Sequence, residues 1–259
     1  MSDALLDNVG VLLTRPEEQS RETAEAISAH GGSVTIFPAL VIAPRDHADI
    51  AADAGELPPA DITVFISRNA VQHGIDWAEG RIAAIGPTTA AAIEDTGRRV
   101  DIRPAAGFDS EALLAEPAFA DVAGLTVRII RGDAGRETLA DTLRARGARV
   151  DYLSAYERRL PQPTPQALAD LEAAWTGGRI DVVVVMSVQS LGNLQRILPP
   201  ACRERLATTP LVSPAARVIK EARQAFPGCP AILAAGPQTG DLVNAIAEAG
   251  AARNEAGQD

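Results

Sequence analysis

The chain has 259 residues, of which 46% are hydrophobic and 22% charged, and this composition is typical of a folded protein and argues against disorder, collagen-like repeats or a coiled coil. Aromatic residues make up 3% and the formal net charge is −10, so neither base stacking nor long-range attraction favours a nucleic acid as ligand. An anionic ligand must therefore be bound by local groups. The length exceeds that of one typical domain and suggests two.

Short runs rich in Val and Ile alternate with Ala-rich amphipathic stretches, a pattern typical of βαβ units with a largely parallel sheet covered on both faces. The sequence therefore predicts an α/β fold. Helices are expected over 17–30 and 136–146, each ending at a glycine, and residues 251–259 are expected to form a solvated tail. The predicted strands are 11–14, 34–37, 62–66, 82–85, 127–130, 150–153, 181–186, 211–212 and 231–234.

Several common kinds of site have no signal in this sequence. Cys202 and Cys229 lack CxxC spacing, so we expect neither a zinc site nor a disulfide framework, and a reducing cytoplasm fits. The three histidines lie in unrelated contexts, and phosphate-binding glycine motifs and a GxSxG elbow are missing, which argues against metal, nucleotide and nucleophilic-serine chemistry. We expect no signal peptide, because residues 1–7 are acidic and lack a basic and an apolar region, and no membrane span, because the purest apolar run is only 182–186.

The sequence also contains internal repeats. Short matches recur in order, such as Arg21-Glu22-Thr23 with Arg136-Glu137-Thr138, Ser67 with Ser187, and Gly86-Pro87 with Ser213-Pro214, and their offset rises from 115 to 127 and then to 129. A steadily rising offset is what small loop insertions produce. We therefore predict two similar α/β domains, with the active site in a cleft between them.

Ligands of open α/β sheets bind outside the carboxyl ends of the strands, and here those positions carry small and polar residues. Ser67, Ser187 and Ser213 suit helix N-caps, and Pro87 and Pro214 suit first helical turns. Several helix N-termini at one cleft can bind several carboxylates or phosphates, whereas each residue alone is better explained as a plain cap. The strand-end groups are Thr14-Arg15, Ser67-Arg68-Asn69, Gly86-Pro87-Thr88-Thr89, Arg131-Gly132-Asp133, Ser187-Val188-Gln189 and Ser213-Pro214.

Tyr156 stands out in a chain so poor in aromatic residues. It closes a predicted strand just before Pro161, in a Pro-bounded connector that occupies the same place in its repeat as the segment around Leu40. Such a phenol either donates a hydrogen bond or a proton near a hinge, or simply packs in the core.

The ordered set of motifs resembles the uroporphyrinogen-III synthase family from about residue 9 to 248. It departs from the family at Ser213-Pro214-Ala215-Ala216, where many members carry a turn with more hydroxyl groups. The motifs that carry the resemblance are Val11-Leu12-Leu13-Thr14-Arg15-Pro16, Phe65-Ile66-Ser67-Arg68-Asn69-Ala70-Val71, Ala84-Ile85-Gly86-Pro87-Thr88-Thr89-Ala90, Asp109-Ser110-Glu111-Ala112-Leu113-Leu114, the turn and helix from Arg131-Gly132 to Leu143, and Tyr156.

The resemblance implies two flavodoxin-like parallel-sheet domains, related by the internal repeat and joined by a two-stranded connector. One would be discontinuous, from 1–38 with 162–259; the other would span 45–155, with connectors at 39–44 and 156–161.

The resemblance also implies the reaction. The family cyclises hydroxymethylbilane, a linear tetrapyrrole with eight carboxylates, to uroporphyrinogen III with loss of water and inversion of ring D, as a hydro-lyase without metal or cofactor. The hydroxyl leaves ring A, ring D attacks through its substituted carbon, and a spiro intermediate fragments and recloses. Tyr156 is the implied catalytic residue. The implied substrate-binding residues are Arg15, Ser67, Arg68, Asn69, Gly86, Thr88, Ser110, Arg131, Gly132, Ser187, Val188 and Ser213.

The resemblance further implies a cytoplasmic monomer that receives its substrate from hydroxymethylbilane synthase, with neither nucleic acid nor membrane as partner. The alternative from another functional class is a two-domain binding or sensor protein for a small polycarboxylate. A flavin-binding electron carrier is a third, less favoured by the scarce aromatic residues and the short hydroxyl run Thr88-Thr89.

Overall fold

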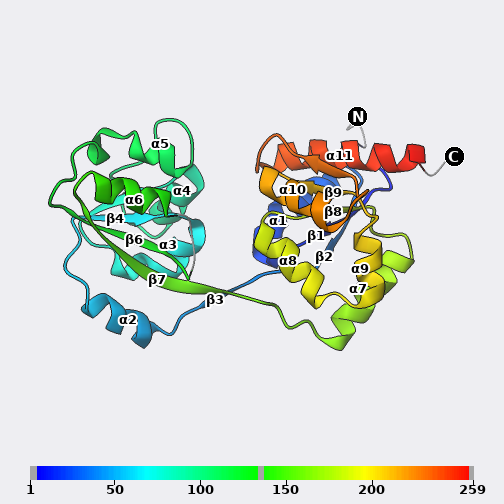
Figure 1. Cartoon of the computed structure of the whole chain (residues 1–259), viewed down its shortest axis with the longest axis horizontal. Helices are drawn as coiled ribbons and strands as arrows, with labels where there is room; N and C mark the ends of the chain where they lie inside the picture. The colour runs from blue at the N-terminus through cyan, green and yellow to red at the C-terminus, as the bar shows by residue number, and fades with distance from the viewer. Residues whose placement is uncertain (1–4, 134–136, 257–259) are drawn as a thin grey trace. The chain divides into compact units, whose positions relative to one another are not determined.

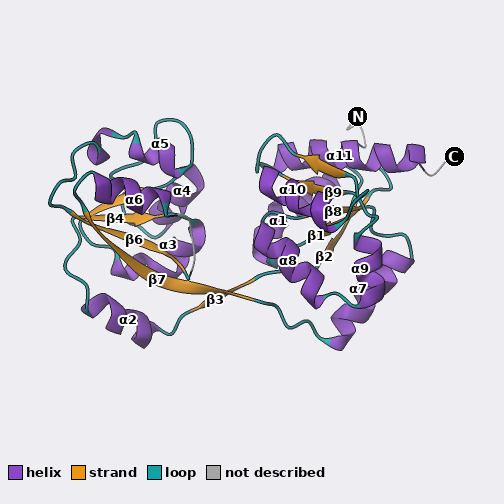
Figure 2. Ribbon diagram, viewed as in Figure 1, coloured by secondary structure: helices purple, strands orange, loops and turns teal. Residues whose placement is uncertain are grey.

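The computed structural model describes residues 5–133 and 137–256, and the chain divides into two compact units. Unit 1 comprises the described residues up to Val41 and from Arg159 onward, and unit 2 is Ile42–Arg158. Both crossing points of the chain fall within the segments 39–44 and 156–161. Each unit is a sheet of hydrogen-bonded strands with helices on both faces (Figures 1 and 2), so the predicted α/β class with parallel sheets is confirmed.

Unit 1 is built on a five-stranded sheet in the order β10-β9-β8-β1-β2, with parallel pairs throughout. Numbered as they occur along the chain and read from β2, these strands have the order 2-1-3-4-5. The elements of unit 1 are β1 (Gly10–Leu13), α1 (Glu17–Ala29), β2 (Ser33–Ile36), α7 (Pro165–Thr176), β8 (Val182–Val184), α8 (Val188–Ile197), α9 (Pro200–Leu206), β9 (Leu211–Ser213), α10 (Ala216–Ala225), β10 (Ala231–Leu233) and α11 (Thr239–Ala256).

The sheet of unit 1 is buried on both faces because its strands are apolar at successive positions. Leu12 and Val183 pack on one side with α7, α8, α9 and α10, whose contributions include Trp175. Val11 and Val182 pack on the other side with α1 and α11. Successive side chains of a strand point to opposite faces of the sheet, so a strand that is apolar at every position needs helices on both faces to cover it.

Unit 2 is built on a second five-stranded sheet, in the order β3-β7-β6-β4-β5. The pairs β6–β7, β4–β6 and β4–β5 are parallel, and Ile102 adds an isolated parallel bridge to Ala83 of β5. If β3 is left out and the strands are numbered from β6 and β7 and then from β4 through β5 to the Ile102 bridge, the spatial order β7-β6-β4-β5-Ile102 also becomes 2-1-3-4-5. The elements of unit 2 are β3 (Val41–Pro44), α2 (His47–Gly55), β4 (Ile62–Phe65), α3 (Arg68–Gly74), η1 (Ile75–Trp77), β5 (Arg81–Ala84), α4 (Pro87–Asp95), α5 (Ser110–Leu114), η2 (Pro117–Phe119), β6 (Thr126–Gly132), α6 (Thr138–Ala145) and β7 (Arg149–Arg159).

The core of unit 2 also has two sides. Val64 and Ile129 pack with α5 and α6 on one face, where Phe119 is fully buried. Phe65 and Ile130 pack with α2, α3 and α4 on the other. The side chains of one strand thus alternate between two helix layers, as the period of a strand requires.

Several local predictions are confirmed. Ser67 and Ser187 are N-caps that accept hydrogen bonds from the backbone N–H groups of Ala70 and Ser190, and Pro87 begins α4. Gly31 and Gly147 follow the ends of α1 and α6, and each has a φ of 86°, the left-handed conformation that glycine adopts without strain.

Other local predictions are wrong. Ser213 is not an N-cap, because its β9 strand continues through it and α10 begins only at Ala216. Pro214 precedes that helix instead of opening its first turn. The predicted strand 150–153 continues to Arg159, and the sequence pattern missed β3 at Val41–Pro44, since both segments carry polar or proline residues that blur strand periodicity. Residues 251–256 of the predicted tail belong to helix α11, because this segment contains good helix formers and no breaker. Arg136, predicted to open a helix, lies outside the described residues.

Arg128 is the largest fully buried side chain, with 1% of its surface exposed, on the central strand β6. Its Nη2 donates to the carbonyl of Pro58 at 2.6 Å, and its Nη1 lies 3.2 Å from Oε2 of Glu79. The Glu79 oxygen also accepts from the backbone N–H of Ala60 at 2.8 Å. Among the described residues, the Nε and Nη1 of Arg128 find no hydrogen-bond acceptor of good geometry, so this buried cation depends on Glu79 for its charge balance.

We expect Glu79→Ala to destabilise unit 2 by about 2 kcal/mol, because it leaves a buried guanidinium without a counter-charge. Arg128→Met should cost less, because it removes the charge and its unsatisfied N–H groups while keeping an apolar stem. Urea unfolding followed by Trp77 fluorescence in a Trp175→Phe background would report on unit 2. A larger loss for Arg128→Met than for Glu79→Ala would contradict this account.

Candidate active site

The carboxyl ends of the parallel strands collect the predicted site residues at one edge of each sheet. In a sheet of order 2-1-3-4-5 the connections diverge between strands 1 and 3, and the crevice at that switch point is the usual ligand position. In unit 1 this point lies between β1 and β8, and in unit 2 between β6 and β4. The residues that follow these four strands are therefore the first candidates for a ligand site.

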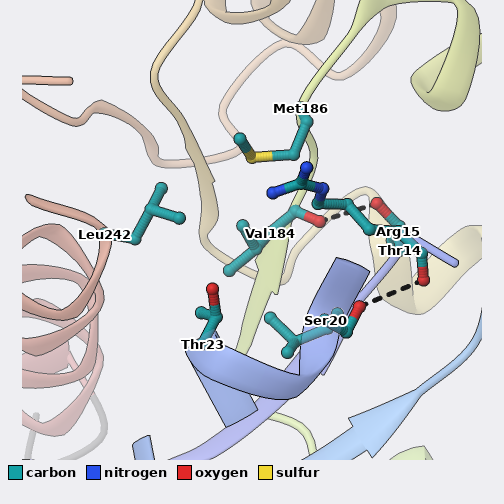
Figure 3. Close-up of a pocket in the computed structure, with 8 residues that line it drawn as sticks. Thr14, Arg15, Ser20, Thr23, Val184, Met186 and Leu242 are labelled. Carbon is teal, nitrogen blue, oxygen red and sulfur yellow. Dashed lines mark hydrogen bonds between the residues drawn. The ribbon is translucent and has the colours of Figure 1, made fainter. Parts of the chain in front are cut away.

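In unit 1, Thr14 and Arg15 follow β1 (Figure 3). The buried hydroxyl of Thr14 donates to the carbonyl of Val184 on β8 at 2.7 Å, so it ties two strands together. Arg15 is partly buried, and its Nη2 donates to Oε1 of Gln19 at 3.3 Å. A small cavity of about 10 Å³ lies between these residues and Met186, which is room for no more than a single water molecule.

On the β8 side of the unit 1 switch point, Ser187 and Val188 lie at the start of helix α8. Ser187 is partly exposed, and its Oγ accepts from the backbone N–H of Ser190 at 3.0 Å and lies 2.9 Å from the Ser190 hydroxyl. Val188 follows as an exposed side chain. Ser213, on the neighbouring strand β9, is fully buried and accepts from the backbone N–H of Ala215 at 3.2 Å, so its hydroxyl stabilises the turn before α10.

In unit 2, Ser67, Arg68 and Asn69 follow β4. The Oγ of Ser67 accepts from the backbone N–H of Ala70 at 3.1 Å, Arg68 is exposed, and Asn69 is partly buried. This group opens helix α3 at the switch point. This strand end thus carries polar side chains and the first backbone N–H groups of a helix.

Gly86 and Thr88 open helix α4 beside this group, because β5 is the neighbour of β4. Gly86 is the N-cap and supplies no side chain, and Thr88 is exposed. A Cβ at Gly86 would lie 2.7 Å from the Cβ of Phe108, an aromatic residue 56% exposed, so glycine is needed for this close approach. Ser110 begins α5, whose N-cap is Asp109.

Tyr156 lies in the interior of unit 2, with none of its surface exposed. It is part of β7, where a bulge sets it opposite Gly132 of β6. Its ring packs directly on that glycine, since a Cβ there would be 2.6 Å from ring atom Cε2. Its hydroxyl lies 3.3 Å from the hydroxyl of Ser67. The structure thus brings together Ser67, Gly132 and Tyr156, which stand far apart in the sequence.

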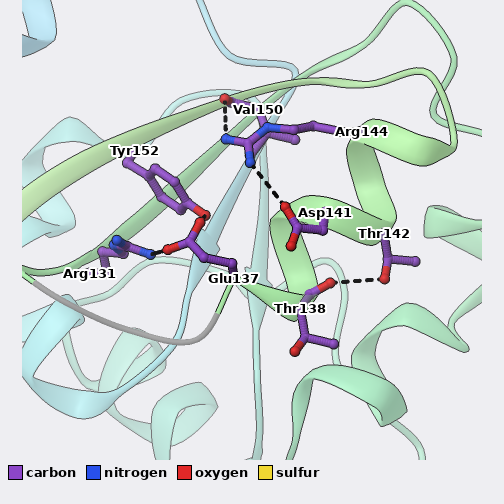
Figure 4. A network of polar contacts seen from close by, with 8 residues as sticks. All are labelled: Arg131, Glu137, Thr138, Asp141, Thr142, Arg144, Val150 and Tyr152. Atoms are coloured by element: carbon purple, nitrogen blue, oxygen red, sulfur yellow. Dashed lines mark hydrogen bonds and ion pairs between the residues drawn. The ribbon is translucent and has the colours of Figure 1, made fainter.

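Arg131 belongs to a different group, with Tyr152 and Glu137 (Figure 4). Its guanidinium stacks on the Tyr152 ring at 3.8 Å, and its Nη1 donates to Oε1 of Glu137 at 2.9 Å, while the Tyr152 hydroxyl donates to Oε2. The two hydrogen bonds lower the pKa of Glu137, that from Tyr152 contributing most. Burial and the same hydrogen bond raise the pKa of Tyr152. The carboxylate therefore stays charged and the phenol stays protonated across the neutral range.

Arg131 and Tyr152 also line an open groove of about 510 Å³. Asp53, Glu56 and Asp133 line it as well, and Asp53 is ion-paired with Arg45 at 2.7 Å. With Arg131 already bound to one carboxylate of the protein and more carboxylates around it, this groove offers little net attraction for an anion. A substrate-binding role for Arg131 stays a prediction.

Sequence reasoning missed Glu137, Tyr152 and Phe108. Glu137 and Tyr152 lie 15 positions apart and meet only through the pairing of β6 with β7, so no local pattern reveals them. Phe108 had a signal, as an aromatic residue directly before the Asp109-Ser110 helix start in a chain with so few aromatic residues. In the described parts of the chain, no group of three or more His, Cys, Asp and Glu side chains is placed to hold a metal ion, and no helix is long and apolar enough to cross a membrane.

Known proteins identify the family of this chain. The family model described as uroporphyrinogen-III synthase HemD matches residues 21–244. The chain belongs to the uroporphyrinogen-III synthase family. The uroporphyrinogen-III synthase of Escherichia coli K12 is 30% identical over 206 residues, which cover 76% of this chain and 82% of that relative. The corresponding protein of Salmonella typhimurium LT2 is 31% identical over 207 residues, with the same shares covered.

The fold is shared as well. The crystal structure of uroporphyrinogen-III synthetase from Helicobacter pylori 26695 matches with a TM-score of 0.58 at 12% identity, over 91% of this chain and 97% of that one. A likeness at so low an identity concerns the fold alone.

We expect Gly132→Ala to destabilise the protein by about 1–3 kcal/mol, because the added Cβ would overlap the buried Tyr156 ring. Gly192→Ala is the matched control: nothing lies within 4 Å of a Cβ there, and alanine in the interior of α8 should gain up to about 1 kcal/mol. Thermal unfolding of both variants measures the difference. Equal stability of the two variants would show that the ring of Tyr156 does not depend on the close approach of Gly132.

Proposed function

We propose that this chain catalyses the reaction of its family, the cyclisation of hydroxymethylbilane to uroporphyrinogen III with loss of water and inversion of ring D. The match of the family model over residues 21–244 is the observation that carries the proposal. The enzyme acts as a hydro-lyase without a metal or cofactor, so its catalytic power comes from positioning and from hydrogen bonds. The alternative, a binding or sensor protein for a polycarboxylate, is not favoured by this membership.

The substrate's carboxylates are bound by backbone N–H groups and hydroxyls at the strand ends. In unit 2 the N-termini of α3 and α4 carry Ser67, Arg68, Asn69, Gly86 and Thr88, and Ser110 opens α5. In unit 1, Arg15 precedes α1, Ser187 and Val188 open α8, and Ser213 shapes the turn before α10. Helix N-termini provide a partial positive charge, which explains how a chain with a net charge of −10 binds an octacarboxylate.

The protein must also control conformation, because the linear substrate cyclises unaided to the type I isomer. Holding carboxylates of several rings at fixed helix ends restricts which carbon of ring D meets the cation on ring A. Single contacts of this kind are replaceable, so loss of one hydroxyl, such as that of Thr88 or Ser187, should weaken binding moderately. Departure of the ring A hydroxyl is assisted by Tyr156, whose hydroxyl reaches the strand end through Ser67.

We also propose that the enzyme works as a monomer in the cytoplasm and receives the linear tetrapyrrole from hydroxymethylbilane synthase. Its two cysteines are free and buried, and burial raises the pKa of both thiols, so they need no oxidising compartment and are unreactive. Neither nucleic acid nor a membrane has a part in the reaction.

We further propose that the two units are copies of one flavodoxin-like domain, joined through β3 and β7, with the second copy permuted. The shared order 2-1-3-4-5 supports this proposal, with β1 corresponding to β6 and β8 to β4. The sequence matches fall on equivalent places: Gly31 and Gly147 have the same φ after equivalent helices, and Ser67 and Ser187 cap equivalent helices. The discontinuous domain is then 1–38 with 162–259, the inserted one is 45–155, and 39–44 with 156–161 connect them.

Incubated with freshly prepared hydroxymethylbilane, the protein should yield mainly the type III isomer, because it holds the rings while ring D inverts. Chromatography of the oxidised products separates type III from type I, and a chelator should not reduce the yield. A product mixture equal to that of the enzyme-free control would refute the enzyme and leave the binding protein.

The proposed domain organisation predicts that a fragment of residues 45–155 folds cooperatively by itself, because it contains β4–β6 and most of β7 with both helix layers. A fragment of residues 1–125 has similar size but separates β4 from β6, so it should unfold without a cooperative transition. Circular dichroism during heating compares the two. A stable 1–125 fragment would favour two consecutive domains instead.

A further inference from the structure

The phenol of Tyr156 and the hydroxyl of Ser67 form a pair at the carboxyl end of β4. Tyr156 has no exposed surface, whereas Ser67 is partly exposed, and their oxygens lie 3.3 Å apart. A group without exposed surface does not meet a substrate directly in this conformation. Its hydroxyl contacts the strand end at the hydroxyl of Ser67.

The ring of Tyr156 is confined on several sides. The backbone of Gly132 packs on one edge so closely that a Cβ there would lie 2.6 Å from Cε2. The ring of His73 lies 5.9 Å away, and the guanidinium of Arg158 lies 5.9 Å from the ring centre. A phenol packed in this way keeps its hydroxyl directed at Ser67, since any swing would require the sheet and α3 to separate.

Ser67 has its own hydrogen-bond requirement. Its Oγ accepts from the backbone N–H of Ala70 at 3.1 Å as the N-cap of α3. A serine hydroxyl has two acceptor sites and one proton. When it accepts from Ala70 and from Tyr156, both acceptor sites are used and its own O–H is left to donate to a ligand at the strand end.

We propose that Ser67 is the catalytic residue that contacts the departing hydroxyl of the substrate, and that Tyr156 is a positioning residue which acts through it. The inference rests on the proposed function. The C–O bond of the ring A hydroxymethyl group breaks with its electron pair on oxygen, which takes the Ser67 proton and leaves as water, while Ser67 takes the proton of Tyr156. The proton that the terminal pyrrole carbon of ring D loses on ring closure restores the phenol, so protons balance over the cycle.

Other N-caps of this chain show that capping alone does not require such a partner. Thr164 caps α7 by accepting from the backbone N–H of Ala167 at 3.2 Å. Ser187 caps α8 with Ser190, another hydroxyl residue, as its side-chain contact. Ser67 combines the cap with a buried phenol, and this combination distinguishes a relay from a cap.

The experiment compares Ser67→Ala, Ser67→Thr, Tyr156→Phe and the double variant Ser67→Ala with Tyr156→Phe. Ser67→Ala should lower kcat about 100-fold with little change in KM, and Tyr156→Phe should lower it no further than that. The double variant should be no slower than Ser67→Ala, because both changes interrupt one path. Ser67→Thr keeps the hydroxyl and should restore kcat to within several-fold of the wild type.

Thr164→Ala is the control for loss of a cap. It should lower the melting temperature about as much as Ser67→Ala and leave kcat unchanged, so a structural role and a catalytic one are separated. Full kcat in Ser67→Ala, or a Tyr156→Phe defect that adds to it in the double variant, would show that Tyr156 meets the substrate itself and would overturn the inference. Formation of only the type I isomer by the wild-type protein would instead refute the proposed function.

Discussion

Parallel pairing of apolar strands is the constraint on which the rest of this molecule depends. Because β1 pairs with β8 and β6 pairs with β4 in parallel, the carboxyl ends of these strands lie side by side and their following residues meet. Strands β1 and β4 are buried at every position, so the polar residues that meet solvent follow the ends of these strands. Hydroxyls and helix N-termini therefore collect at one edge of each sheet.

The charge of the protein is divided in a similar way, between its side chains and the backbone at the strand ends. Acidic side chains outnumber basic ones by ten, yet the strand ends offer helix N-termini whose partial positive charge belongs to the backbone. Arg131 shows the contrast, because its guanidinium is already held by Glu137 and by the ring of Tyr152. A chain that binds anions through backbone groups does not need a basic surface, and net charge then says little about its ligand.

The sequence predicted features that depend on neighbours along the chain. Strands β1 and β4 come from runs of apolar residues, and the caps Ser67 and Ser187 come from a hydroxyl at the start of a helix. It failed where one residue type suits two local structures: Ser213 before Pro214 has the pattern of a cap but ends a strand. It also failed where partners are distant, as for Glu137 with Tyr152, because strand register decides which side chains meet.

Tyr156 shows how burial changes the meaning of a residue found by pattern. Its type and place suggested either a donor near a hinge or a residue packed in the core, and its contacts place it in the core with its hydroxyl against Ser67. A phenol in the core is shielded from bulk water, so its hydrogen-bond direction is fixed by packing instead of by solvent. The bulge opposite Gly132 and the missing side chain of that glycine are what allow a phenol to lie there. The contacts beneath this strand end are thus determined by the backbone geometry of the folded sheet, which the sequence pattern does not show.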